Sequence, residues 1–135
     1  MSITYNVKVY SLSKEGNIKV RPNFRVREFR CQDGSDAVFV GDEIADVVQD
    51  LRDASGDEVY INSAYRTQPH NARVGGEKYS NHLYGIAVDV RSKVWSAKQV
   101  FDYLDAKYHD KYSIGYYRAG YVHIDTQPDK ERWFS

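Results

Sequence analysis

Residues 80–90 read SNHLYGIAVDV, and residues 121–125 read YVHID. The chain has four histidines, and two of them stand in these stretches, each close to an aspartate. Both stretches contain alternating apolar residues, which is the period of a β-strand with one buried face. They are therefore either two unrelated surface segments or two halves of one site on a sheet.

The strand period assigns the side chains of YVHID to two faces. Val122 and Ile124 fall on one face, which we expect to be the core. Tyr121, His123 and Asp125 fall on the other face. His123 should therefore point away from the core.

The first stretch supplies a second histidine and a carboxylate. Asp89 belongs to the run IAVDV at 86–90 and lies opposite its larger apolar side chains, while His82 precedes that run. If the two runs are neighbouring strands, then His82, Asp89 and His123 converge. Two imidazoles and one carboxylate with an open fourth position form the ligand set of a catalytic zinc site, where the metal activates water and polarises a carbonyl group.

Other interpretations of these residues stay open. A histidine beside an aspartate is more often a surface residue or a structural hydrogen bond than a metal ligand, because short motifs occur often by chance. His123 and Asp125 with a distant histidine would instead resemble the facial triad of an iron(II) oxygenase, which leaves Asp89 without a role. We assign no function to His70, in a polar loop, or to His109, at a helix end.

The remaining sequence predicts an α+β fold with a small, mainly antiparallel sheet and two main helices. The expected elements are strands at 4–10 and 18–20, a helix at 42–54, strands at 58–62 and 86–90, a helix after Ser96, and strands near 113–117 and 121–125. The first helix has an apolar stripe that includes Ile44 and Leu51, and Ser96 with Gln99 forms a capping box for the second. The small number of helices and the expected hairpins favour this class over a doubly wound parallel sheet. Residues 63–82 form a polar loop without a period, and loops of this length are often functional.

The composition is that of a single domain over residues 1–135, and it argues against nucleic acid and membranes as partners. The three prolines and nine glycines mark no linker, and the single Cys31 excludes an intramolecular disulfide. A formal net charge of zero provides no basic surface for nucleic acid or an anionic membrane. No stretch approaches the roughly 20 apolar residues of a membrane-spanning helix. We expect a monomer.

The sequence resembles the D-Ala-D-Ala carboxypeptidase family of zinc peptidases, peptidase family M15. The runs that carry this resemblance are INSAYRT at 61–67, HNARVGG at 70–76, SNHLYGIAVDV, VHID and a final RW. Residues 27–34, REFRCQDG, are similar to small phage and prophage members, and the resemblance spans residues 24–133. Its core, S-x-H-x-x-G-x-A-x-D followed by V-H-x-D, fixes several residue types at fixed offsets.

The resemblance implies a hedgehog-like zinc peptidase domain in which His82, Asp89 and His123 hold one Zn²⁺ ion. Ser80 would begin the metal motif and tie down its loop. Arg66 corresponds to an arginine that faces substrate oxygen, and we expect it to be solvated on the long loop. The implied reaction is cleavage of an amide in the peptide stem of bacterial peptidoglycan. If Arg66 binds a terminal carboxylate the enzyme is a carboxypeptidase, and with an open cleft it is an endopeptidase.

The sequence departs from the family just before its last metal ligand. Many relatives have an acidic residue or a second histidine there, whereas residues 118–121 are Arg, Ala, Gly and Tyr. Asp125 is either the general base or a carboxylate that orients a ligand. Tyr121 either donates a hydrogen bond to a developing oxyanion or stacks in the cleft. Should neither act, Glu77 is the only carboxylate in the long loop.

The missing acidic residue motivates an alternative function from a different class. In that reading the chain is a catalytically impaired, zinc-stabilised module that binds the cell wall. The N-terminal run MSITYNVKVYSLSKEG has no apolar segment of the kind found in signal peptides. We therefore expect synthesis in the cytoplasm without a signal peptide, followed by phage-type release to the cell wall.

Overall fold

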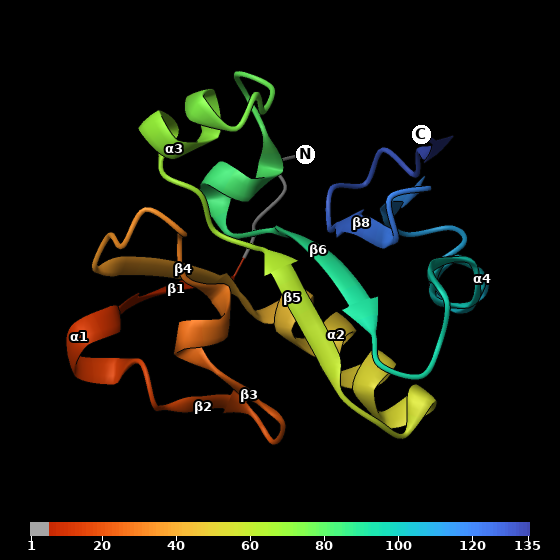
Figure 1. Cartoon of the computed structure of the whole chain (residues 1–135), viewed down its shortest axis with the longest axis horizontal. Helices are drawn as coiled ribbons and strands as arrows, with labels where there is room; N and C mark the ends of the chain where they lie inside the picture. Colours follow the sequence, from red (N-terminus) through yellow and green to blue (C-terminus); the bar gives the residue numbers. More distant parts are fainter. Residues whose placement is uncertain (1–5) are drawn as a thin grey trace.

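A five-stranded sheet forms the centre of the computed structural model, which describes residues 6–135 (Figure 1). Its strands, in spatial order, are β5 (Val59–Ser63), β6 (Ala87–Ser92), β8 (Tyr121–Asp125), β7 (Ser113–Tyr117) and β9 (Arg132–Phe134). Neighbouring strands are antiparallel except β7 and β9, which run parallel. The expected α+β class with a mainly antiparallel sheet is confirmed.

Two helices cover one face of this sheet. They are α2 (Asp42–Ser55) and α4 (Ala97–Lys107); α2 begins and ends close to its predicted bounds, and α4 begins directly after Ser96, as predicted. α2 ends at Gly56, whose φ of 74° is the left-handed conformation of a helix C-cap. α4 begins with the expected capping box between Ser96 and Gln99. Leu51 of the first helix is fully buried in the core.

The core lies between these helices and the apolar face of the sheet. Its sheet residues include the alternating Val88 and Val90 of β6 and the alternating Val122 and Ile124 of β8. This confirms the core face that the strand period assigns in YVHID. The opposite face of the sheet is consequently left to polar and aromatic side chains.

The N-terminal part adds two small antiparallel pairs beside the main sheet (Figure 1). They are formed by β1 (Val7–Ser11) with β4 (Ala37–Gly41) and by β2 (Lys19–Arg21) with β3 (Phe24–Arg25). The short helix α1 (Leu12–Glu15) and the 3₁₀ turn η1 (Val26–Phe29) connect them. The first residues of the strand expected at 4–10 lie outside the described residues.

The long loop at 63–82 is more ordered than the sequence predicts. It contains α3 (Gln68–Arg73) and leads into the 3₁₀ turn η2 (Asn81–Tyr84). Both elements are too short for a helical apolar period, and hydroxyl groups cap them: Thr67 accepts from the His70 N–H, and Ser80 accepts from the His82 N–H. None of the helices within 6–135 has the length and apolar character needed to span a membrane.

Candidate metal centre

One row of side chains crosses the open face of the main sheet. In the strand register each member of this row is paired with the next one across the sheet. The order is Ser63, Asp89, His123, Gly115 and Trp133. Directly paired residues of neighbouring strands project to the same face. Because β6 and β8 are neighbours, Asp89 and His123 stand next to each other.

His82 reaches this row from η2, which precedes β6. The Ser80 hydroxyl accepts from the His82 backbone N–H at 3.2 Å and fixes the start of the turn. Gly85 ends the turn with φ 73°, and a Cβ at this position would lie 2.7 Å from the backbone oxygen of Phe39. The turn therefore requires glycine, and it returns the chain to β6 with the His82 side chain over Asp89.

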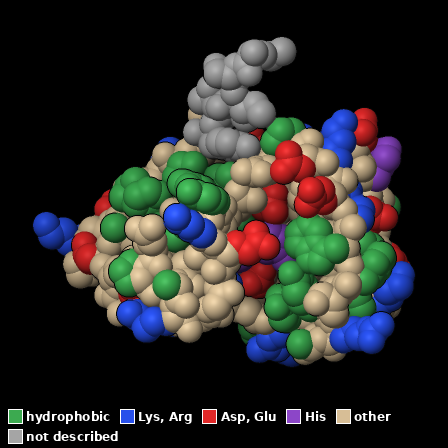
Figure 2. Space-filling view, turned by 90° about the horizontal axis from the view of Figure 1, so that it is seen from above, with side chains coloured by type: hydrophobic (Ala, Val, Ile, Leu, Met, Phe, Trp, Pro, Cys, Tyr) green, Lys and Arg blue, Asp and Glu red, His purple; other side chains and the backbone are tan. Residues whose placement is uncertain are grey.

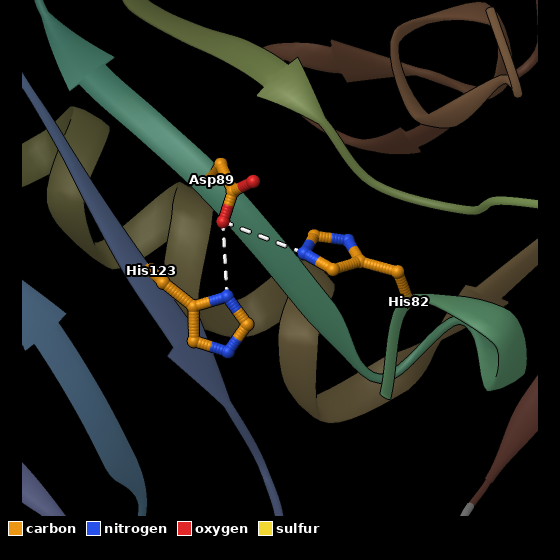
Figure 3. A group of neighbouring side chains, drawn as sticks. All are labelled: His82, Asp89 and His123. Carbon is orange, nitrogen blue, oxygen red and sulfur yellow. Dashed lines mark hydrogen bonds and ion pairs between the residues drawn. The ribbon is translucent and has the colours of Figure 1, made fainter. Parts of the chain in front are cut away.

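Three ligand atoms from these segments converge (Figure 3). The Oδ1 atom of Asp89 lies 2.9 Å from Nδ1 of His123 and 3.4 Å from Nε2 of His82. One potential ligand atom from each of the three residues lies within 4.8 Å of the others. The structure thus brings together the three residues that the sequence proposes as metal ligands.

The other nitrogen of each imidazole meets an oxygen acceptor. Nδ1 of His82 lies 2.7 Å from the carbonyl oxygen of Ala64, and Nε2 of His123 lies 2.8 Å from Oδ2 of Asp125. These acceptors hold the N–H on the outer nitrogen, so the inner nitrogens of both rings face Asp89. Metal-ligating histidines are oriented in the same way, and the donor set fits a zinc ion.

The family of the chain follows from a comparison with known protein families. A family model described as peptidase M15 matches residues 22–125. The chain belongs to the peptidase M15 family. The resemblance in its sequence is therefore confirmed, and M15 membership implies a peptidase. Searches of curated proteins and of solved structures give no match to this M15 family member.

Asp125 has both carboxylate oxygens occupied within the M15 site. Oδ2 bonds His123, and Oδ1 accepts from the Gln127 backbone N–H at 3.2 Å. The residue is only 4% exposed. Of its two possible roles, these contacts favour the carboxylate that orients a ligand over the general base.

The charges of the cluster are strongly coupled. Burial raises the pKa of Asp89, but hydrogen bonds and ion pairing with His123 and His82 hold it well below its usual range. Burial lowers the pKa of His123, whereas contacts with Asp125 and Asp89 outweigh burial and raise it to about 9. Asp89 is consequently ionised at neutral pH and ready to bind a cation.

Arg66 corrects one expectation from the sequence. Its side chain is only 15% exposed rather than solvated. Its guanidinium donates to Ser63 Oγ at 3.1 Å and to Asn71 Oδ1 at 3.2 Å, and it lies 3.5 Å from Asp89 Oδ2. The buried Asn71 also donates to the Glu77 carbonyl at 2.7 Å, so it joins Arg66 to the loop above the site.

An aromatic wall stands on the other side of His123. The Trp133 ring lies over Gly115, where a Cβ would approach the ring to 2.2 Å, and its centroid is 5.4 Å from that of His123. Trp133 Nε1 donates to the Tyr117 hydroxyl at 2.9 Å. Tyr117 stacks on Tyr121 with centroids 4.5 Å apart. The Tyr121 ring therefore stacks in the cleft, as one of its two interpretations expects.

The site lies on a cleft of about 950 Å³. Figure 2 shows the hollow, with a histidine inside it and acidic side chains gathered around it. The lining includes Glu131, which the sequence reasoning did not consider. Its alternation with Trp133 is a signal that could have found it, because residues two apart on a strand share a face.

Proposed function

We propose that this M15 family member is a zinc-dependent peptidase that hydrolyses an amide in the peptide stem of bacterial peptidoglycan. One observation carries most of the support: both imidazoles of the cluster already have their outer N–H groups on acceptors. Ala64 and Asp125 supply these acceptors, 2.7 Å and 2.8 Å away. An ordinary surface histidine has no need for such orientation.

The chemistry divides between the metal and the chain. A zinc ion held by His82, Asp89 and His123 would supply Lewis acidity to the scissile carbonyl group and to water. Asp125 keeps the His123 ring in its tautomer and orientation. Arg66 lines the cleft, and its guanidinium is oriented by a hydrogen bond to Asn71. From this position it would bind a carboxylate or carbonyl oxygen of the substrate.

The iron(II) interpretation receives less support from the same contacts. Asp125 meets His123 at Nε2, while Asp89 meets it at Nδ1 and also faces His82. An ion bound by Asp125 and His123 Nε2 would therefore leave out Asp89, the carboxylate that both histidines approach. The zinc set uses all three converging atoms.

Metal content and cleavage together test the proposal. Purified chain should retain close to one zinc per molecule and release D-Ala or new amines from purified peptidoglycan. Released D-Ala indicates a carboxypeptidase, whereas new internal amines indicate an endopeptidase. Near-stoichiometric zinc in a His82→Ala, His123→Ala double variant would contradict the ligand assignment.

The alternative function predicts a different pair of results. A catalytically impaired wall-binding module would bind zinc and sediment with peptidoglycan but would release neither D-Ala nor amines. The stem peptide as partner, and phage-type delivery to the wall, remain part of our proposal. Detection of the chain outside uninfected, prophage-free cells would argue against that route.

A further inference from the structure

Glu131 is a cleft carboxylate whose backbone is fixed beside the metal centre. Its N–H donates to Ser113 Oγ at 3.1 Å, and its carbonyl accepts from the Ile114 N–H at 2.9 Å. These bonds attach Glu131 to the start of β7, immediately before β9 begins. Its side chain is exposed and lines the same cleft as the metal cluster.

The sheet register places Glu131 on the face of the site. Trp133, two residues later, lies on the cleft face, so strand alternation puts Glu131 on that face as well. Ser113, its hydrogen-bond partner, is paired with Asp125 of β8. Glu131 therefore extends the row that contains Asp125, one step along the sheet from the row that contains His123.

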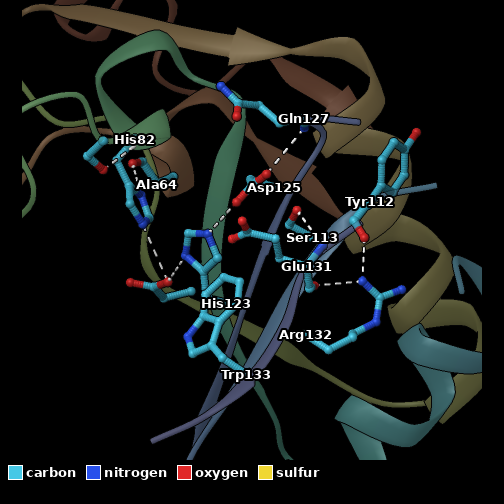
Figure 4. Close-up of polar contacts among 12 residues, drawn as sticks. Ala64, His82, Tyr112, Ser113, His123, Asp125, Gln127, Glu131, Arg132 and Trp133 are labelled. Carbon is cyan, nitrogen blue, oxygen red and sulfur yellow. Dashed lines mark hydrogen bonds and ion pairs between the residues drawn. The ribbon is translucent and has the colours of Figure 1, made fainter. Parts of the chain in front are cut away.

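Small residues on β7 leave room for side chains of β9 to cross it. Trp133 uses the space above Gly115 and reaches the His123 ring. Ser113, two residues earlier on β7, is also small, and its hydroxyl accepts from the Glu131 N–H. Figure 4 shows the Glu131 side chain extending from its backbone toward His123.

We propose that Glu131 is the general base of the peptidase, an inference that rests on the proposed function. Asp125 is engaged by His123 and Gln127 through both oxygens, whereas the Glu131 side chain is exposed to solvent in the cleft. Glu131, the residue before β9, supplies the carboxylate that residues 118–121 lack. A carboxylate within hydrogen-bond reach of a reacting water is suited to this role.

The reaction balances with this single proton carrier. The oxygen of a water molecule bonds to the amide carbon while Glu131 accepts one of its protons. The carbon–nitrogen bond then breaks, and Glu131 returns that proton to the departing nitrogen. The second water proton ends on the same nitrogen, so the products are a carboxylate and an ammonium group.

Replacement of Glu131 by glutamine removes the basic group and keeps the shape. In zinc-loaded Glu131→Gln, kcat should fall by about 10²–10⁴-fold, the usual contribution of general-base catalysis. Zinc content, melting temperature and calorimetric affinity for a stem peptide should match the wild type. Asp102→Asn is the control, because it removes one negative charge from the exposed face of α4, outside the cleft.

Chemical rescue separates a proton acceptor from a structural residue. Glu131→Ala leaves a gap that formate can enter, so added formate should restore part of the rate in this variant and none in Glu131→Gln. Unchanged kcat in Glu131→Gln, or a loss of activity that parallels a loss of zinc or of melting temperature, would overturn the assignment. A wild type that cleaves no peptidoglycan would overturn the proposed function as well, whereas a cleaving wild type with an equally active Glu131→Gln variant would overturn only this inference.

Discussion

His123 has a carboxylate on each side of its ring, and we propose different roles for the two carboxylates. Asp89 meets the nitrogen that faces His82, and Asp125 meets the nitrogen on the far side. The same two-residue spacing in the sequence is compatible with a base or an orienting carboxylate at 125, so sequence alone cannot choose between them. The occupied oxygens of Asp125 supply the distinction, and they depend on the Gln127 backbone as well as on His123.

Asp125→Asn tests this assignment at the level of one residue. If Asp125 orients His123, the change should weaken zinc affinity by about 10–100-fold, and activity should return at high zinc concentration. Competition with a chromophoric chelator measures the affinity. A large fall in kcat at full zinc occupancy would instead make Asp125 the base and contradict the role of Glu131.

Zinc and protons should compete for His123. In the metal-free chain its pKa is about 9, above its ordinary value, because contacts with Asp125 and Asp89 outweigh burial. Such a raised pKa stabilises the metal-free fold below pH 6.5, and this stabilisation is lost as the pH rises through about 9. Zinc binding must displace the proton, so affinity should fall as the pH is lowered from 9. Calorimetry at pH 7 in two buffers of different ionisation enthalpy should detect proton release, and its absence would contradict the expectation.

At the scale of elements, the sequence predicts those helices and strands whose own residues show a clear hydrophobic period. α2 and α4 have apolar stripes and caps within their own residues, and β6 and β8 alternate clearly. The elements missed, such as β4 and α3, are short and depend on distant partners or hydroxyl caps. β9 was not predicted for the same reason, because it has only three residues and depends on parallel pairing with β7.

Two substitutions compare the stability contributed by a core residue of a helix with that contributed by a residue of the long loop. Leu51→Ala empties a fully buried position of α2 and should cost about 2–5 kcal/mol of unfolding free energy. Arg66→Ala should cost roughly 1–3 kcal/mol, because it leaves Ser63, Asn71 and Asp89 without a mostly buried donor. Urea denaturation of zinc-free protein measures both. If Leu51→Ala left the unfolding free energy unchanged while Arg66→Ala unfolded the domain, our assignment of Leu51 to the core and of Arg66 to the cleft would be wrong.

At the scale of the whole molecule, the two faces of the main sheet have different roles. One face packs on two helices, and the other presents the row that runs from Ser63 to Trp133. The convergence of His82, Asp89 and His123 could be predicted because Asp89 and His123 lie on adjacent strands and His82 lies in the turn before the first of them. The alternation of Glu131 with Trp133 is visible in the sequence, but their place beside His123 depends on the pairing of β9 with β7, which no local pattern specifies.

The cluster joins η2, β6 and β8, so zinc should stabilise the folded chain as a whole. An unfolded chain does not hold the three ligands together, and a metal that binds only the native state at 100 times its dissociation constant adds about 2.7 kcal/mol. Chelator treatment should therefore lower the melting temperature of the wild type, and added zinc should restore it. The His82→Ala, His123→Ala double variant should melt at one temperature with or without zinc, because it keeps the core and loses two ligands. A wild type whose melting temperature ignores both chelator and zinc would mean that the converging side chains do not form a metal site.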